Sequence, residues 1–377
     1  MALDPVPTLS ELAEQTPTRR DFLIKSTLIG ALAPLALTGC DIDDTDHNRG
    51  ERRSERASAT PQGGPSTAVH NADSKLDTGG RADVHHSTAV GSGTSGPLPF
   101  RRFDPILPPL TATRTSKIQF TAREVPLKVA DDVTVSAWTF DGDIPGPVLH
   151  VRQGDSVEFT LVNHGAIPHS MDFHSSQIDP KVAFRSVPPG QPISYTFQAK
   201  YPGAFLYHCG TSPVLMHIGS GMVGAIIVDP PSPLPQAKEF VLVQSEYYLG
   251  APKAGVLPFD YTKMLATLPD YVVFNGRPSQ YMAAPIKVKV GDRVRFYVVN
   301  AGPTHPCNFH VVGEQFDTVY LGSPPAMPLR GVQTFAVAPG GGLIFELIAD
   351  IPGEYVFVNH GFGHGQKGAI GILEVEA

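Results

Sequence analysis

The C-terminal two thirds of the chain contains an internal repeat. "VRQGDSVEFTLVNHGAIPHSMDFH" at 151–174 matches "VKVGDRVRFYVVNAGPTHPCNFH" at 288–310 with one deletion, and "YPGAFLYHC" at 201–209 is echoed by "IPGEYVFVNH" at 351–360. Both copies consist of short runs rich in β-branched and aromatic residues, separated by Pro and Gly, which is typical of strands in a sandwich or barrel. We therefore predict two copies of one β-domain in tandem, meeting near residue 235.

The alignment of the two copies also compares their polar residues. It pairs His169 with His305, Asp172 with Asn308, and His174 with His310. Cys209 and Met222 have no counterpart, so only the first copy offers sulfur ligands to a metal.

The N-terminus, residues 1–40, has the pattern of an export signal. Paired Arg19 and Arg20 precede an apolar run of about 15 residues, which is shorter than a helix needs to span a bilayer. The Arg pair followed by Phe22 and Leu23 resembles a bacterial twin-arginine signal, and "LTGC" resembles a lipobox, which makes Cys40 a lipidation candidate. We expect an exported protein, periplasmic or tethered to the periplasmic face of the inner membrane. The alternative is an ordinary uncleaved anchor.

Residues 41–105 are dominated by small, polar and charged residues, and are predicted to form a disordered tether because they offer too little apolar surface to offset the entropy of ordering. The net charge of −7 is spread along the chain, without the clustered basic face that nucleic-acid binding requires. Three cysteines far apart cannot form a disulfide framework.

The stretch "LYHCGTSPVLMHIGSGM", residues 206–222, carries the ligands of a soft metal. A thiolate, two imidazoles and a weak thioether form the blue-copper arrangement, and Cys209, His217 and Met222 supply three of these four donors. His169, which follows the predicted strand "SVEFTLVN", is the candidate for the fourth. The alternative is that the sulfur residues only fill the core.

A second metal beside the first is also predicted. His208 precedes Cys209, so on a strand its side chain points to the opposite face. His174 lies five residues after His169, and His360 in "VFVNHGFGH" would complete a three-histidine site with an open position for substrate. The pair His208 and Cys209 would then be a short covalent bridge between the two metals.

Residues 115–377 resemble the copper-containing nitrite reductases. "PGPVLHVRQGDSVEFTLVN", "PHSMDFH", "PGAFLYHC" with "GMVGAIIV", and "PGEYVFVNH" all have parallels in that family, in the same order. The resemblance implies an all-β fold of two tandem Greek-key cupredoxin β-sandwich domains, at 106–232 and 233–377. The first domain would hold type 1 copper.

The resemblance further implies two coppers per chain. Type 1 copper would be bound by His169, Cys209, His217 and Met222, and type 2 copper by His174, His208 and His360. In that family the last of these histidines reaches the type 2 copper of an adjacent subunit, so a homotrimer is implied.

The implied reaction is one-electron reduction of nitrite to nitric oxide, with the electron coming from a soluble donor such as a cupredoxin or cytochrome c. Asp172 matches the carboxylate that binds nitrite and relays protons. The second proton-handling residue of the family, a His, lies five residues after a His, and Gln315 occupies that position here. Gln does not titrate near neutral pH, so we expect proton delivery to depend on Asp172 and water.

Two other functions remain open. One is a multicopper oxidase acting on oxygen or on small organic or metal substrates. An oxygen-reducing trinuclear cluster needs His-x-His pairs, and the sequence contains none. The other is a non-catalytic blue-copper electron carrier, which would hold one copper per chain.

Overall fold

The computed structural model describes residues 96–324 and 328–377. The predicted export signal, the lipidation candidate Cys40 and most of the predicted tether lie outside these residues. Within them, no helix combines the length and apolar character needed to cross a membrane.

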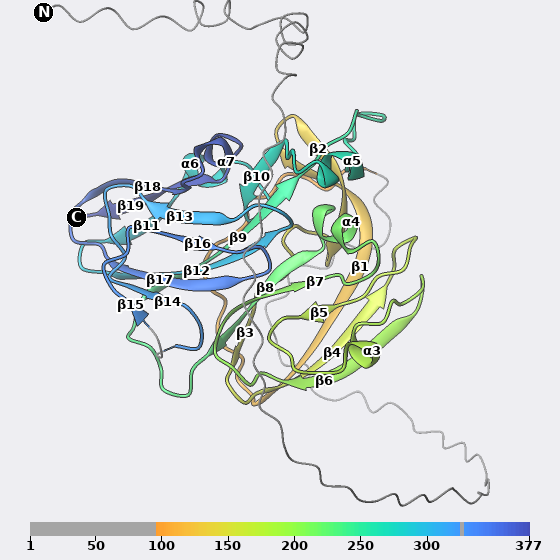
Figure 1. The fold of residues 1–377 in the computed structure, drawn as a ribbon, viewed down its shortest axis with the longest axis horizontal. Helices are drawn as coiled ribbons and strands as arrows, with labels where there is room; N and C mark the ends of the chain where they lie inside the picture. Colours follow the sequence, from red (N-terminus) through yellow and green to blue (C-terminus); the bar gives the residue numbers. More distant parts are fainter. Residues whose placement is uncertain (1–95, 325–327) are drawn as a thin grey trace, which may run out of the picture. The chain divides into compact units, whose positions relative to one another are not determined.

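The first half of the described chain forms two four-stranded sheets (Figure 1). In spatial order the first sheet contains β2 (Val133–Phe140), β1 (Thr115–Ala130), β4 (Ser156–Asn163) and β6 (Pro192–Gln198). The second contains β3 (Leu149–Arg152), β8 (Val223–Asp229), β7 (Gly203–His208) and β5 (Asp172–Phe173). Strands such as β6 alternate exposed and buried residues, which places one face of the sheet on the core.

The second half repeats this plan with two larger sheets. One contains β10 (Tyr271–Phe274), β9 (Lys238–Tyr247), β12 (Arg293–Gly302), β17 (Gly342–Ile348), β14 (Thr318–Tyr320) and β15 (Pro328–Leu329). The other contains β11 (Ala284–Lys289), β19 (Ile370–Glu376), β18 (Gly353–Asn359), β13 (Cys307–Val311) and β16 (Thr334–Val337).

Five short helices lie between the described strands. They are α3 (Pro180–Ala183), α4 (Val214–Gly219), α5 (Tyr261–Leu265), α6 (Gln280–Ala283) and α7 (Phe362–Gln366). α4 follows β7 and α7 follows β18, so each copy of the repeat has a helix at the same point of its topology.

The strand pairing confirms the predicted all-β fold of two tandem sandwiches. In both copies the first strand pairs in parallel with the fourth, since Ala122 lies opposite Asn163 and Gln244 opposite Asn300. β3 and β8 are likewise parallel, as are β11 and β19. The predicted bounds of the two domains, 106–232 and 233–377, remain a prediction.

The pairing also corrects the residue alignment of the two copies. The Asn163 amide donates to Ile167 O and Val187 O, whereas the Asn300 amide donates to His305 O and Val337 O. His305 therefore corresponds to Ile167 rather than to His169.

The same register continues along the next strand. Asp172 lies opposite His208 on β7, and His310 lies opposite Val358 on β18. His208 and Val358 correspond in the repeat, because they directly precede the matched residues Cys209 and Asn359. His310 thus takes the position of Asp172, and Cys307 that of His169. The alignment was wrong because the loop after Asn300 is one residue longer than the loop after Asn163, so matching the two "FH" pairs shifted the register.

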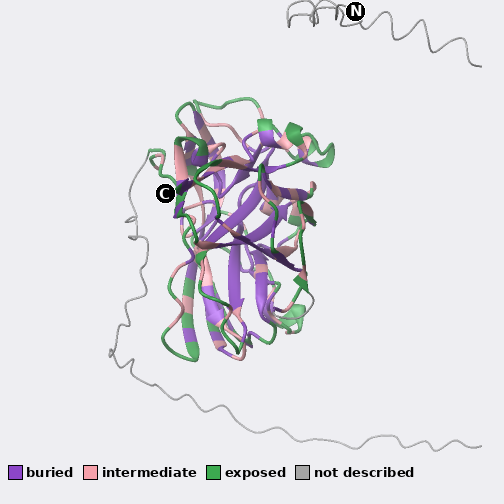
Figure 2. Cartoon of the chain, turned by 90° about the vertical axis from the view of Figure 1, so that its left-hand side faces the viewer, coloured by how far each residue is buried: buried purple, intermediate pink, exposed green. Residues whose placement is uncertain are grey.

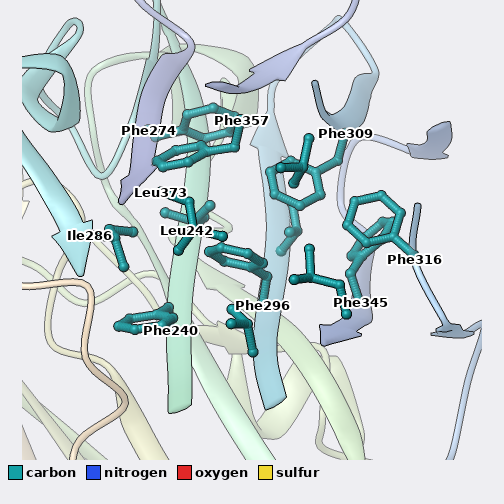
Figure 3. Packing of buried hydrophobic residues seen from close by; sticks show 14 of the residues in the cluster. Phe240, Leu242, Phe274, Ile286, Phe296, Phe309, Phe316, Phe345, Phe357 and Leu373 are labelled. Carbon is teal, nitrogen blue, oxygen red and sulfur yellow. The ribbon is translucent and has the colours of Figure 1, made fainter. Parts of the chain in front are cut away.

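Each sandwich encloses its own apolar core, and a third cluster joins the two. Phenylalanines dominate the second core, where Phe296, Phe309 and Phe357 lie against one another (Figure 3). The joining cluster packs β7 and β8 against β9, β12 and β17, and includes Leu206 and Val299. The central strands are accordingly buried while exposed residues gather in the loops (Figure 2). The sheet that carries His208 is thus held between the two domains.

Gly224 on β8 offers a stability test of this packing. A Cβ at this position would overlap the phenol of Tyr207, which is fully buried and donates a hydrogen bond to Pro147 O. We expect Gly224→Ala to lower the free energy of unfolding by about 1–3 kcal/mol, the usual cost of overpacking. Urea unfolding measures it, and Gly322→Ala, where a Cβ meets no atom within 4 Å, is the control. Equal stability of the two variants would contradict the expectation.

Candidate metal centres

The first group of metal-ligating side chains is His169, Cys209 and His217. All three are buried, and one ligand atom from each lies within 4.8 Å of the others. The Cys209 Sγ is 3.2 Å from the His217 Nδ1, which is 3.3 Å from the His169 Nδ1. His169 follows β4 in the loop that bridges to Val187, Cys209 directly follows β7, and His217 lies on α4. The fold thus brings together residues that are 48 and 8 positions apart in the chain.

Cys209 is held in the form that binds metals. Burial by itself raises the pKa of a thiol, but hydrogen bonds with His169 and His217 and from the Ser170 N–H outweigh it, and the Cys209 pKa lies well below its ordinary value. The Ser170 N–H reaches the sulfur at 3.3 Å. A buried thiolate needs a compensating cation, which suits a metal.

Met222 is tied to this group through the backbone. The Cys209 N–H donates to Met222 O at 3.1 Å, and the Met222 N–H donates to His217 O at 3.2 Å. The Met222 side chain is fully buried in the same apolar cluster as Cys209. The turn after α4 therefore places the Met222 backbone beside that of Cys209, with both side chains buried in one apolar cluster.

Two side chains orient the imidazoles of the first group. The His169 Nε2–H donates to the Glu124 carboxylate at 2.9 Å, which leaves the Nδ1 as the free lone pair. The Trp138 ring packs edge-on against His217, with ring centroids 4.8 Å apart. Glu124 is not among the site residues predicted from the sequence. The sequence does contain a pattern that could have indicated it, because both copies of the repeat carry Glu at the same position of their first strand, Glu124 and Glu246.

The second group is Asp172, His174 and His208, with ligand atoms again within 4.8 Å of one another. Asp172 and His208 are opposite each other on β5 and β7, and the carboxylate lies 3.8 Å from the His208 Nε2. His174 is exposed, Asp172 is half-buried, and His208 is buried. The group therefore opens to solvent on one side, unlike the first.

The two histidines of the second group are arranged as ligands. The His174 Nδ1–H donates to Gly340 O at 2.8 Å, and the His208 Nδ1–H donates to Cys209 O at 3.0 Å. Both Nε2 atoms then carry lone pairs, and they face each other at 3.0 Å. Burial and the neighbouring His208 lower the pKa of His174, so a shared proton is disfavoured. Two converging lone pairs fit a shared metal ion.

The carbonyl that fixes His174 comes from the other domain. Gly340 lies in the turn between β16 and β17 and adopts a φ of 81°, which favours glycine. The second group therefore depends on the packing of the two sandwiches, whereas the first is built within one sandwich.

His360 belongs to neither group of ligands found in the described residues. It is exposed after β18, with its ring centroid 5.1 Å from that of His310 and 4.6 Å from that of Phe362. Within one chain, then, the predicted third histidine of the second site stands apart from the other two.

Of the two residues His310 and Gln315, the structure places His310 beside His360. Gln315 is exposed and lies in the loop after β13. His310 lies on β13 beside His360, and its Nδ1–H donates to Gln333 O at 2.6 Å, which leaves the Nε2 free. The structure therefore places a titratable side chain next to His360, at a residue that the sequence alignment had paired with His174.

Comparison with known proteins decides the family. Multicopper oxidase family models match residues 121–233 and 254–376. The copper-containing nitrite reductase of Neisseria meningitidis serogroup A is 40% identical over 268 residues, which cover 69% of this chain and 69% of that protein. The chain belongs to the copper-containing nitrite reductase family.

Solved structures agree with this membership. A copper nitrite reductase from Nitrosomonas europaea is 38% identical, with a TM-score of 0.63 over 69% of this chain and 94% of that one. A multicopper oxidase is 29% identical, with a TM-score of 0.62 over 70% of this chain and 89% of that one. The predicted resemblance, the cupredoxin fold and the class of enzyme, an oxidoreductase of this family, are confirmed.

Proposed function

We propose that this protein reduces nitrite to nitric oxide at two copper centres, consuming one electron and two protons and releasing one water for each nitrite. The observation that carries the proposal is the pair of ligand groups joined through adjacent residues, Cys209 in one and His208 in the other. Relatives named as copper-containing nitrite reductases support nitrite as the substrate.

The first centre is assigned to His169, Cys209, His217 and Met222. Two imidazole nitrogens, a thiolate and a buried thioether are soft donors of the kind that favours copper, and burial keeps the centre from binding substrate. The second centre is assigned to His174 and His208, with His360 as its third ligand. Copper would supply one-electron redox chemistry at the first centre and an open coordination position for nitrite at the second.

Proton supply is assigned to two side chains of this chain. Asp172 lies beside His208 with 28% of its side chain exposed, so its carboxyl can both hydrogen-bond an anion at the second centre and exchange protons with solvent. His310 is assigned the second proton. Its free Nε2 lies on the side of the ring away from Gln333, and its ring neighbours the assigned ligand His360.

The homotrimer that the family resemblance implies agrees with the position of His360. Because His360 stands apart from His174 and His208 in one chain, it would serve the second centre of an adjacent copy, and a closed ring satisfies every such centre. The electron would come from a soluble donor such as a cupredoxin or cytochrome c. We propose a periplasmic protein, with a lipid anchor at Cys40 as an option that the described residues do not include.

Oxygen reduction is the second candidate function, because a multicopper oxidase is among the similar structures. The absence of His-x-His pairs from the whole sequence argues against the trinuclear cluster that such a reaction uses.

An anaerobic assay tests the proposal directly. The copper-loaded full chain, given nitrite and an artificial reductant, is expected to produce nitric oxide in proportion to nitrite consumed. Consumption of oxygen without nitric oxide from nitrite, at full copper loading, would establish the oxidase alternative instead.

Replacing His360 by Ala tests the shared centre. We expect copper content to fall from about two per chain towards one, because the second centre would keep only two of the three protein ligands that a catalytic metal site typically has. The blue colour of the first centre should be kept. Elemental analysis and visible spectroscopy measure both. His364→Ala, four residues later on α7, is the control. Unchanged copper content in the His360 variant would refute the assignment.

A further inference from the structure

Glu124 contacts His169, one of the ligands proposed for the first centre. Its Oε1 accepts the Nε2–H of His169 at 2.9 Å, while its Oε2 accepts the Ala166 N–H at 2.8 Å. The imidazole is fully buried, and the carboxylate side chain is 24% exposed. A charged hydrogen bond to a buried imidazole is little screened by solvent, so the charge of Glu124 acts strongly on the ring.

The loop after β4 is shaped around this pair. A Cβ added to Gly165 would lie 2.7 and 2.9 Å from the two carboxylate oxygens and 2.9 Å from the His169 Nε2. Any larger side chain at this position would have to displace the carboxylate or the imidazole. Glycine thus leaves the space in which the carboxylate meets the ring.

The second sandwich shows what the carboxylate does without an imidazole. Glu246 takes the same position on β9, and its oxygens accept the N–H groups of Thr304 and His305. The residue at the position of His169 there is Cys307, and the hydroxyl groups of Tyr248 and Thr304 donate to the Glu246 carboxylate in place of an imidazole. Holding the loop is therefore common to both copies, and the bond to the imidazole is specific to the copy that carries the sulfur ligands.

We propose that Glu124 is a positioning residue that sets the reduction potential of the first centre. This inference rests on the proposed copper function of His169 and Cys209. A carboxylate on the outer N–H of a ligating imidazole fixes its tautomer and makes the inner nitrogen a stronger donor. A stronger donor stabilises the oxidised, more highly charged metal. Glu124 therefore lowers the reduction potential of the centre and favours onward transfer of the electron.

Two variants separate the charge from the hydrogen bond. Glu124→Gln keeps an oxygen acceptor of the same length but removes the charge. Gly165→Ala keeps the charge but pushes the carboxylate from the ring. Glu158→Gln removes an exposed carboxylate from the neighbouring strand β4, where it pairs with Lys117, and serves as the control.

Redox titration of the visible absorption of the copper-loaded full chain measures the midpoint potential. We expect Glu124→Gln to raise the midpoint potential by at least about 59 mV, which corresponds to a tenfold change in the equilibrium constant of a one-electron couple. Gly165→Ala should raise it in the same direction, and the Glu158 variant should match the wild type.

If the Glu124→Gln protein is blue and has the same midpoint potential as the Glu158 control, this inference is wrong while the proposed function still stands. If that variant does not bind copper, the Gly165→Ala potential decides in the same way. A wild-type protein without a blue centre would refute the proposed function, and this inference with it.

Discussion

The Cys209→Ser variant is expected to lose the blue colour and to stop accepting electrons from a soluble donor. A serine hydroxyl does not ionise at neutral pH, so the thiolate that defines the first centre disappears while the backbone hydrogen bond from Ser170 keeps an acceptor. Replacement of an outer hydrogen-bonding partner costs about 10- to 100-fold in metal affinity, and loss of the thiolate itself should exceed that. Visible spectroscopy and copper analysis measure both effects.

The chain supplies a matched control in Cys307, the other cysteine in the described residues. It is also fully buried, and burial alone raises the pKa of its thiol. Cys307→Ala should keep the blue centre and donor-driven nitrite turnover. Loss of colour in the Cys307 variant, or its survival in Cys209→Ser, would contradict the assignment of the thiolate.

His310→Asn is expected to lower nitrite turnover by about 10²- to 10⁴-fold, the usual contribution of a general acid. Asparagine fills nearly the same space and can donate to Gln333 O, but it carries no titratable proton. Both centres should still bind copper, because His310 is in neither ligand group of the described residues. Steady-state assays with nitrite, alongside copper analysis, measure the change.

Gln315→His is the companion variant and separates the structural assignment from the sequence-based one. Gln315 is exposed in the loop after β13, so a histidine there is expected to leave turnover unchanged. If Gln315→His raised turnover several-fold while His310→Asn stayed active, proton supply would run through position 315, as the sequence alignment indicated.

The sequence by itself determined the fold class and placed three of the four residues proposed for the first centre close together. Alternating and β-branched runs specify strands, and a repeat of such runs specifies two similar sandwiches. The reason is that the alternation of apolar and polar residues along a strand already decides which face of the sheet is buried. Cys209, His217 and Met222 lie within 14 residues on one strand end and the following helix, so their proximity is also local. His208 and Cys209, as neighbours on a strand, face opposite sides for the same reason.

Only the tertiary structure decided which distant residues meet. Gly340 reaches His174 because the sandwiches pack together, and Glu124 reaches His169 because β1 lies beside β4 in one particular register. The register of β13 moved His310 to the position of Asp172, which a count of residues across a loop of different length had missed. The register depends on how two strands pair across the sheet and on the length of the loop between them, so a count of residues along one strand does not fix it.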